Sequence, residues 1–98
     1  MFDKAKKMWR VQSQAKRIQK ELREMEFVGE ELGGKVKVVV NGEQKVQRIE
    51  IADELMNMSE KENLERFLKQ AMTSAISRSQ QSASEKMKSV AKDLGIGL

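Results

Sequence analysis

Positive charge is concentrated in the first 23 residues, which the sequence predicts to form one long helix. This stretch holds eight lysines or arginines against two acids, a net charge of +6, whereas the other 75 residues carry −2. On a helix, side chains seven residues apart share one face at a spacing of about 10 Å, which suits contact with successive phosphate groups. Such binding would release counterions and depend steeply on salt. The candidate phosphate-binding residues of this stretch are Lys4, Lys6, Lys7, Arg10, Lys16, Arg17, Lys20 and Arg23.

Two further features could contact a polyanion. The polar stretch 77–89 combines basic residues with glutamines and serines, which commonly contact phosphates; its candidates are Arg78, Lys86 and Lys88. Trp9 could stack on or wedge into nucleic acid, although packing against a second helix, predicted below at about residues 60–93, or against a partner chain is the interpretation that we favour. For both basic stretches, the alternative is a solvated face that only keeps the protein soluble.

The chain contains no cysteine and no histidine. Disulfides, zinc fingers and Cys or His nucleophiles are therefore excluded. Gly33-Gly34 lacks the other residues of a phosphate-binding loop and precedes a strand pattern, so it indicates a turn. Asp53 and Glu54 form a lone acidic pair, without the cleft that paired catalytic carboxylates need. The sequence accordingly predicts no catalytic residue, metal site, cofactor or small-molecule substrate, and a protein that is not an enzyme.

An apolar stripe runs along the basic stretch. Its residues are spaced 3-4-3-4-3, the a and d positions of a heptad: Met8, Val11, Ala15, Ile18, Leu22 and Met25. The pattern predicts a helix from about Asp3, an N-cap residue, to about Glu26. The stripe could be plain core or a coiled coil between chains. We expect its end near Leu22 and Met25 to pack internally, and its N-terminal end to pack beyond the sheet.

A β-hairpin is predicted at the centre of the chain. The run KVKVVV (35–40) alternates, Asn41-Gly42 is a strong turn signal, and QKVQRIEI (44–51) is the return strand. The segment FVGEEL (27–32) could add a third strand through a turn at Gly33-Gly34.

The register of this hairpin follows from its apolar residues. A two- or four-residue loop containing Asn41-Gly42 puts the apolar residues of both strands on one face, whereas a three-residue loop separates them. We therefore expect an even-length loop. The apolar face would hold Val36, Val38, Val40, Ile49 and Ile51. The other face would be mostly solvated and would hold Lys35, Lys37, Val39, Val46, Arg48 and Glu50.

A second helix is predicted from about Glu60 to about Asp93. Ser59 and Glu62 have the spacing of a capping box. The helix then repeats apolar residues at helical intervals, in a dense row followed by a thinner one: Leu64, Phe67, Leu68, Ala71, Met72, Ala75 and Ile76, then Ala83, Met87, Val90 and Leu94.

The lengths of these elements favour an assembly. The helices, about 36 and 50 Å long, exceed a hairpin strand of about 23 Å, so parts of both must pack on each other or on a second copy. We predict a single α+β domain over residues 1–98, an αβββα subunit with two long helices and a small antiparallel sheet. Two subunits would form an intertwined or side-by-side homodimer with projecting helical arms. The dimer or core seam would comprise Met8, Val11, Ile18, Leu22, Met25, Val36, Val38, Val40, Ile49 and Ile51.

Nearly the whole sequence resembles one known protein family in the order of its features. The resemblance is carried by the start MFDKAKKM, the helix ending in EMEFVGEELGG, the block KVKVVVNGEQKVQRIEI, the stretch ADEL, and EKM at 85–87. The order of these features resembles the YbaB/EbfC family of bacterial nucleoid-associated proteins. The resemblance implies a homodimer that binds double-stranded DNA in a tweezer-like grip, with roles in nucleoid organisation and gene regulation. The chain differs from relatives in lacking a Gly- and Met-rich opening and in ending early at GIGL.

The predicted function is DNA binding mainly through the phosphate backbone. Sequence preference should be weak, because no element resembles the recognition helix of a helix-turn-helix. No apolar run spans a membrane and no signal peptide is evident, so we expect a cytoplasmic, nucleoid-associated protein. Two alternatives are a coiled-coil-like protein-interaction adaptor that binds no nucleic acid, and a peripheral membrane helix over residues 1–11, which include Phe2 and Trp9.

Overall fold

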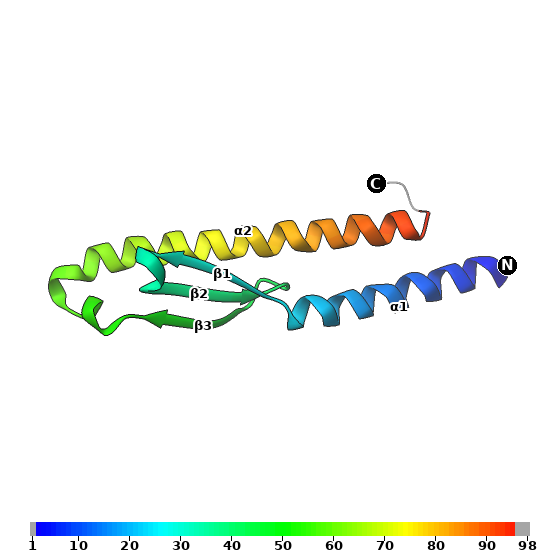
Figure 1. Ribbon diagram of the computed structural model, residues 1–98. Helices are drawn as coiled ribbons and strands as arrows, with labels where there is room; N and C mark the ends of the chain where they lie inside the picture. Colours follow the sequence, from blue (N-terminus) through cyan, green and yellow to red (C-terminus); the bar gives the residue numbers. More distant parts are fainter. Residues whose placement is uncertain (1, 96–98) are drawn as a thin grey trace.

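The computed structural model describes residues 2–95 of the chain. Figure 1 shows an elongated molecule with a helix at each end of the sequence and a small sheet between them. This part is 67 Å long and 20 by 17 Å across. The αβββα order and the α+β class are therefore confirmed. The elements are α1 (Phe2–Glu24), β1 (Glu26–Glu31), β2 (Val36–Asn41), β3 (Val46–Ile51) and α2 (Lys61–Asp93).

The boundaries differ slightly from the expected ones. The helix α1 ends at Glu24, because Glu26 already pairs with Asn41 as the first residue of β1. The predicted third strand is confirmed as β1, and the turn after it is a short 3₁₀ helix, Leu32–Gly34. The sheet is antiparallel throughout, in the order β1-β2-β3.

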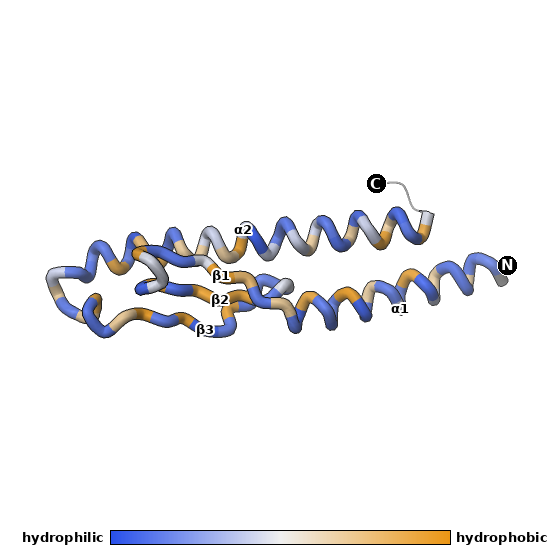
Figure 2. Tube along the Cα trace, in the orientation of Figure 1, coloured by the Kyte–Doolittle hydropathy of each residue, from blue (hydrophilic) through white to orange (hydrophobic). Residues whose placement is uncertain are grey.

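The hydrophobic core lies between α2 and one face of the sheet (Figure 1). Three alternating valines of β2 and two alanines of α2 are fully buried at its centre: Val36, Val38, Val40, Ala71 and Ala75. The first row of apolar residues predicted for the second helix packs around them, together with β1 and β3 residues: Phe27, Ile51, Leu64, Phe67, Leu68, Met72 and Ile76. Figure 2 shows these apolar stretches along the strands and at intervals on both helices.

The strand β1 and the helix α2 approach each other closely at Gly29. Gly29 pairs with Val38, so its α-hydrogens face α2. A Cβ atom at this position would fall on the carbonyl oxygen of Ala71 and lie 3.0 Å from the backbone nitrogen of Ala75. The distance between helix and sheet therefore depends on the absence of a side chain here.

The predicted strand register is confirmed. Val36 pairs with Ile51, and Val38 pairs with Ile49, so the apolar residues of the two strands share one face. Ile51 is half-buried against the core, but Ile49 is 44% exposed. The reason is that α2 lies over β1 and β2, whereas β3 is the edge strand that α2 does not cover.

Four residues, 42–45, connect β2 to β3, which agrees with the expected even length, but Asn41 belongs to β2 and not to the loop. The Asn41 N–H donates to the carbonyl oxygen of Lys45 (2.9 Å), which closes the turn. A β-bulge at Val39/Val40 shifts the pairing by one residue between the turn and the rest of the two strands. Gln44 accommodates the turn with a φ of +65°. The bulge itself was not predicted from the sequence.

The outer face of the sheet also differs from the expectation. Val39, predicted to lie on a mostly solvated face, is fully buried. Its neighbours across the strands are Val28 and Arg48. On the same face, the Arg48 guanidinium forms ion pairs with Glu26 (3.1 Å) and Glu50 (3.7 Å). The aliphatic parts of these charged side chains exclude water from the valine between them.

The helical segment that leads into α2 is capped by a residue that the sequence did not indicate, whereas the first residue of α2 itself has no side-chain cap. A short 3₁₀ helix, Met58–Glu60, precedes α2, and the Asn57 Oδ1 accepts hydrogen bonds from the Glu60 N–H (3.0 Å) and the Ser59 hydroxyl. The predicted capping box of Ser59 and Glu62 is therefore wrong. The extra turn moves the cap two residues toward the N-terminus.

We expect Asn57→Ala to lower the free energy of unfolding by about 1 kcal/mol, because the Glu60 N–H at the start of the helical segment loses its acceptor. The melting temperature should fall by roughly 4–8 °C. Ser59→Ala, which leaves this acceptor in place, should have a smaller effect. Urea denaturation of both variants measures the difference, and a larger loss for Ser59→Ala would contradict the assignment of the cap.

The turn of the β2–β3 hairpin joins both helices to the sheet. The Gly42 N–H donates to the Leu22 carbonyl oxygen near the end of α1 (2.6 Å), and the Ser79 hydroxyl donates to the Asn41 carbonyl oxygen (2.7 Å). Asn41 and Ser79 are buried. This junction fixes the point at which α1 leaves the sheet.

Candidate nucleic-acid interface

Both helices continue past the sheet and lie beside each other at one end of the molecule (Figure 1). We call α1 and residues 77–93 of α2 the arms. The Lys86 Nζ and the Glu21 Oε2 are 3.1 Å apart and connect the two arms. The arms carry all eleven of the candidate phosphate-binding residues.

The apolar stripe of α1 divides into two parts. Ile18 and Leu22 are buried, and Met25 just after the helix is half-buried, which confirms internal packing at this end of the stripe. Met8 and Val11, farther from the sheet, are 65% and 37% exposed. The N-terminal half of the stripe thus lies beyond the sheet as predicted, and this chain leaves it largely uncovered.

Charge is distributed unevenly along the molecule. The helix α1 holds eight bases and three acids, a net charge of +5, and residues 66–95 hold six bases and two acids, a net charge of +4. Residues 25–65, which form the sheet and its connections, hold five bases and ten acids, a net charge of −5. A polyanion is therefore attracted to the arms and repelled from the opposite end.

The outward face of α1 is the most accessible part of this positive region. Trp9, Lys16 and Lys20 follow one another at helical intervals, with Lys6 one turn before Trp9, and all four are exposed. Within residues 2–95, the three lysines form no salt bridge. Their ammonium groups are thus available to phosphate groups without the loss of an internal partner.

Several other candidates are engaged within the chain. The Arg23 Nε lies 2.9 Å from the Glu43 Oε1, and the Arg17 Nε lies 3.9 Å from the Glu21 Oε1. The Arg78 Nη1 donates to the Val28 carbonyl oxygen of β1 (2.9 Å). Such residues would have to share or exchange partners on binding a phosphate, whereas Lys88 is exposed on α2.

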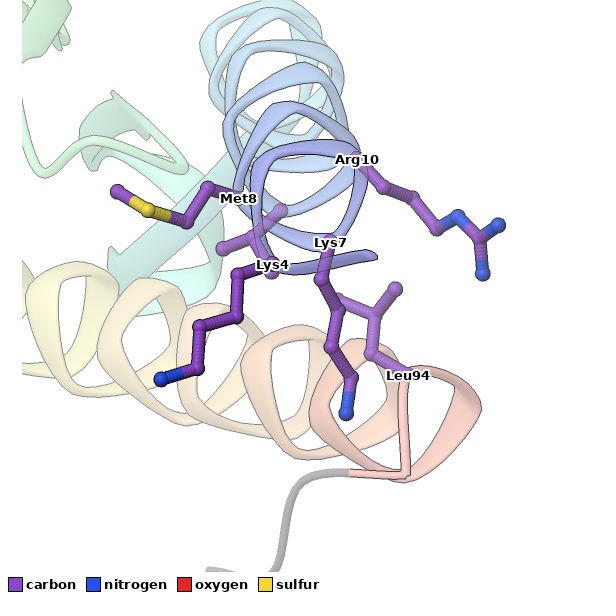
Figure 3. A pocket seen from close by; sticks show the side chains of 6 residues that line it. Lys4, Lys7, Met8, Arg10 and Leu94 are labelled. Atoms are coloured by element: carbon purple, nitrogen blue, oxygen red, sulfur yellow. The ribbon is translucent and has the colours of Figure 1, made fainter. Parts of the chain in front are cut away.

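Three more candidates surround a groove between the ends of the arms. The groove has a volume of about 390 Å³ and is lined by Lys4, Lys7, Met8, Arg10, Val11 and Leu94. In Figure 3, Lys4 and Lys7 extend from α1 toward α2, whereas Arg10 points away from it. The structure therefore divides the candidate cations of α1 among the outward face, ion pairs within the chain, and the rim of this apolar groove.

Trp9 does not pack on the second helix. It is 73% exposed and borders a shallow hollow of about 180 Å³ with Gln12, Ser13 and Lys16. Of the two packing partners that the sequence suggested, α2 is therefore excluded, while a partner chain and nucleic acid stay open.

The described residues contain neither a cluster of metal-binding side chains nor a helix suited to crossing a membrane. Among residues 2–95, no group of three or more acidic, cysteine or histidine side chains is arranged to hold a metal ion. In the same part of the chain, neither helix has the length and the apolar character that a membrane crossing requires.

The YbaB/EbfC DNA-binding family matches residues 1–94 of this sequence. The chain belongs to this family. A nucleoid-associated protein of Synechococcus elongatus is 40% identical over 96 residues, which cover 98% of this chain and 84% of that protein. A nucleoid-associated protein of Hahella chejuensis is 36% identical over 96 residues, covering 98% of this chain and 88% of the relative.

A solved structure of another protein has a fold similar to that of this YbaB/EbfC chain. The crystal structure of an uncharacterized protein from Helicobacter pylori matches with a TM-score of 0.64 at 18% sequence identity, covering 89% of this chain and 96% of the other. This likeness concerns the fold alone. It agrees with the αβββα arrangement described above.

Sequence reasoning about this YbaB/EbfC protein missed the structural use of Arg78 and Ser79. Arg78 contacts the edge strand β1, and Ser79 binds the hairpin turn from 38 positions along the sequence. Both lie in the stretch 77–89, in which nearly every residue is polar. Ser79 follows Ala71 and Ala75 at intervals of four, so the repeat of small residues was a signal that it faces the sheet.

The ion pair between Arg23 and Glu43 has a measurable consequence. The hydrogen bond from the Arg23 guanidinium lowers the pKa of the Glu43 carboxyl below its ordinary value. A carboxyl whose pKa is lower in the folded state stabilises the fold above its unfolded pKa, and this contribution is lost as the pH falls through the lowered value.

We expect Arg23→Gln to raise the Glu43 pKa toward its ordinary value and to remove this acid-range change in stability. Arg17→Gln is the matched control, because Arg17 pairs with Glu21 instead. Titration of the Glu43 carboxyl by carbon-13 NMR checks both variants. An unchanged Glu43 pKa in Arg23→Gln would show that the ion pair does not form in solution.

Proposed function

We propose that this YbaB/EbfC protein binds double-stranded DNA through the phosphate backbone, using the outward face of α1. The observation that carries the proposal is the row of exposed lysines, Lys6, Lys16 and Lys20, on a helix with a net charge of +5. Family membership and the names of the nucleoid-associated relatives support the same ligand. Lysines contact phosphates as point charges, without reading bases.

The binding unit in this proposal is a homodimer. Exposed apolar residues support it: Met8 and Val11 at the end of α1, and Val46 and Ile49 on the edge strand β3, lie outside the core of the single chain. Burying such residues against a second copy would remove them from water, at about 25 cal/mol per Å² of apolar surface. Two copies would then present two cationic helices to one duplex.

The cellular role that we propose is nucleoid organisation and gene regulation, in the bacterial cytoplasm. Each arm is a single uninterrupted helix that carries lysines, arginines, glutamines and serines, and the arms do not form a helix-turn-helix. Sequence preference should therefore be weak. A binding protein of this kind needs no catalytic group, and we propose no enzymatic activity.

A gel-shift series at rising salt, combined with the mass of the protein in solution with and without duplex DNA, tests the proposal. The logarithm of the binding constant should fall linearly with the logarithm of the salt concentration, and the free protein should have the mass of a dimer. Affinity that is constant from low to physiological salt would contradict backbone binding. A monomeric mass would contradict the dimer.

A further inference from the structure

The end of the molecule opposite the arms has an exposed apolar surface with negative charge around it. We call residues 53–64 the acidic end. Met58 is 91% exposed and Met56 is 65% exposed, and both border a hollow of about 330 Å³ that Leu55, Asn57, Lys61 and Leu64 complete. The segment holds four acids and one base, a net charge of −3.

Exposed methionines around a hollow are typical of binding surfaces. The thioether side chain is flexible and polarizable, and it makes favourable contacts with aromatic rings. Met56 and Met58 do not belong to the hydrophobic core, which α2 and the sheet already form around the valines of β2. Packing within this chain therefore does not account for two methionines at this end. The negative charge around the hollow favours an occupant that combines an apolar or aromatic group with cations.

The outward face of α1 has these properties. Trp9 is the one tryptophan of the chain and is 73% exposed. Lys6 and Lys16, on the same face, form no salt bridge within residues 2–95. Asp53 and Glu62 at the acidic end likewise form no ion pair among the described residues, so both sets of charges are available to a partner.

We propose that the acidic end of one copy binds the outward face of α1 of another copy, with Trp9 in the methionine-lined hollow. Asp53 and Glu62 would face Lys6 and Lys16 across this contact. The acidic end and the arms lie at opposite ends of a 67 Å molecule (Figure 1), so the contact cannot form within one chain.

Such an interface joins two different surfaces, which leaves one free copy of each surface after every contact. Assemblies held by such heterologous contacts either close into rings or extend into filaments. The proposed contact comprises one aromatic side chain in a hollow and two facing pairs of charges, which is a small interface. Assembly should therefore be weak and should depend on protein concentration. It uses a different face from Met8 and Val11, and it is therefore compatible with a dimer formed through those residues.

Sedimentation velocity of the full chain without DNA, over a series of protein concentrations at low salt, tests this inference. The sedimentation coefficient should rise continuously with concentration and should stop rising at high salt. Met58→Ser and Trp9→Ala should each raise at least tenfold the concentration at which the increase begins. Met87→Ser is the matched control, because Met87 is 51% exposed on α2 away from both surfaces, and it should behave as the unaltered chain.

Mixing the two variants gives the sharpest result. Met58→Ser retains an intact α1 face and Trp9→Ala retains an intact acidic end, so an equimolar mixture should assemble where neither variant does alone. A mixture that assembles no better than the separate variants, or an unaltered chain whose coefficient is independent of concentration, would overturn the inference. Because DNA is absent, the outcome is separate from that of the gel-shift test.

Discussion

Gly29→Ala is expected to lower the free energy of unfolding by about 3 kcal/mol, the upper end of the usual range for an overpacked site. The added methyl group would fall on the backbone carbonyl of Ala71, and backbone cannot move aside as a side chain can. Either α2 shifts away from β1, or the strand itself bends. For a domain of this size, the melting temperature should fall by roughly 12–24 °C.

Gly33→Ala is the control for this prediction. Gly33 has a φ of +66°, and a Cβ atom there meets nothing within 4 Å. The substitution should therefore cost only the strain of a left-handed alanine, about 1 kcal/mol. Thermal unfolding followed by circular dichroism measures both variants. If Gly29→Ala were no more destabilising than Gly33→Ala, the close packing of α2 on β1 would be incorrect.

The double substitution Lys16→Gln and Lys20→Gln is expected to weaken binding to double-stranded DNA by roughly 100-fold at about 0.1 M salt, since each lost phosphate contact releases nearly one counterion fewer. The slope of log K against log salt should become less negative by about two. Both side chains are exposed, so the fold should be unchanged. Fluorescence anisotropy with a labelled duplex, repeated at several salt concentrations, measures the affinity and the slope together.

The matched control is Lys35→Gln with Lys61→Gln, since Lys35 pairs with Glu54 at the acidic end. This variant loses the same charge from the sheet and the acidic end, where residues 25–65 carry a net charge of −5. Its affinity for DNA should change by less than about threefold, because exposed charges more than a Debye length away are largely screened. Equal losses in the two double variants would mean that total charge, and not the outward face of α1, determines binding.

The parts of the fold that could be predicted from sequence are those in which side chains alternate or repeat. The valines of β2 alternate, and their pairing with Ile49 and Ile51 follows because any other register would separate the apolar residues. The early apolar row of α2, from Leu64 to Ile76, repeats at helical intervals and forms the other half of the core.

The features that could not be predicted depend on contacts between distant residues or on backbone detail. The β-bulge at Val39/Val40 leaves no mark in the pattern of side chains. The cap by Asn57 depends on a single 3₁₀ turn inserted before α2, and the sequence shows an equally good capping pattern at Ser59. Such choices are decided by differences of about 1 kcal/mol.

The candidate site divides in the same way. Its position on a basic helix followed from charge counting, but the pattern did not distinguish a cation that faces outward from one that has an internal partner. Lys16 and Lys20 face outward, whereas Arg23 and Arg78 are held by Glu43 and by the backbone of β1. These partners lie 20 and 50 positions away in the sequence.

The uninterrupted course of α2 has a consequence for how this protein can change over evolution. The helix runs from the alanines packed on the sheet to the arm without a break, and the chain contains no proline. One residue inserted between Ser79 and Lys86 would therefore rotate every later side chain by about 100°. Lys86 would lose Glu21, and the arm would turn a different face outward. Insertions and deletions in this stretch should be tolerated only near whole numbers of turns, such as seven residues, so its length is constrained as well as its composition.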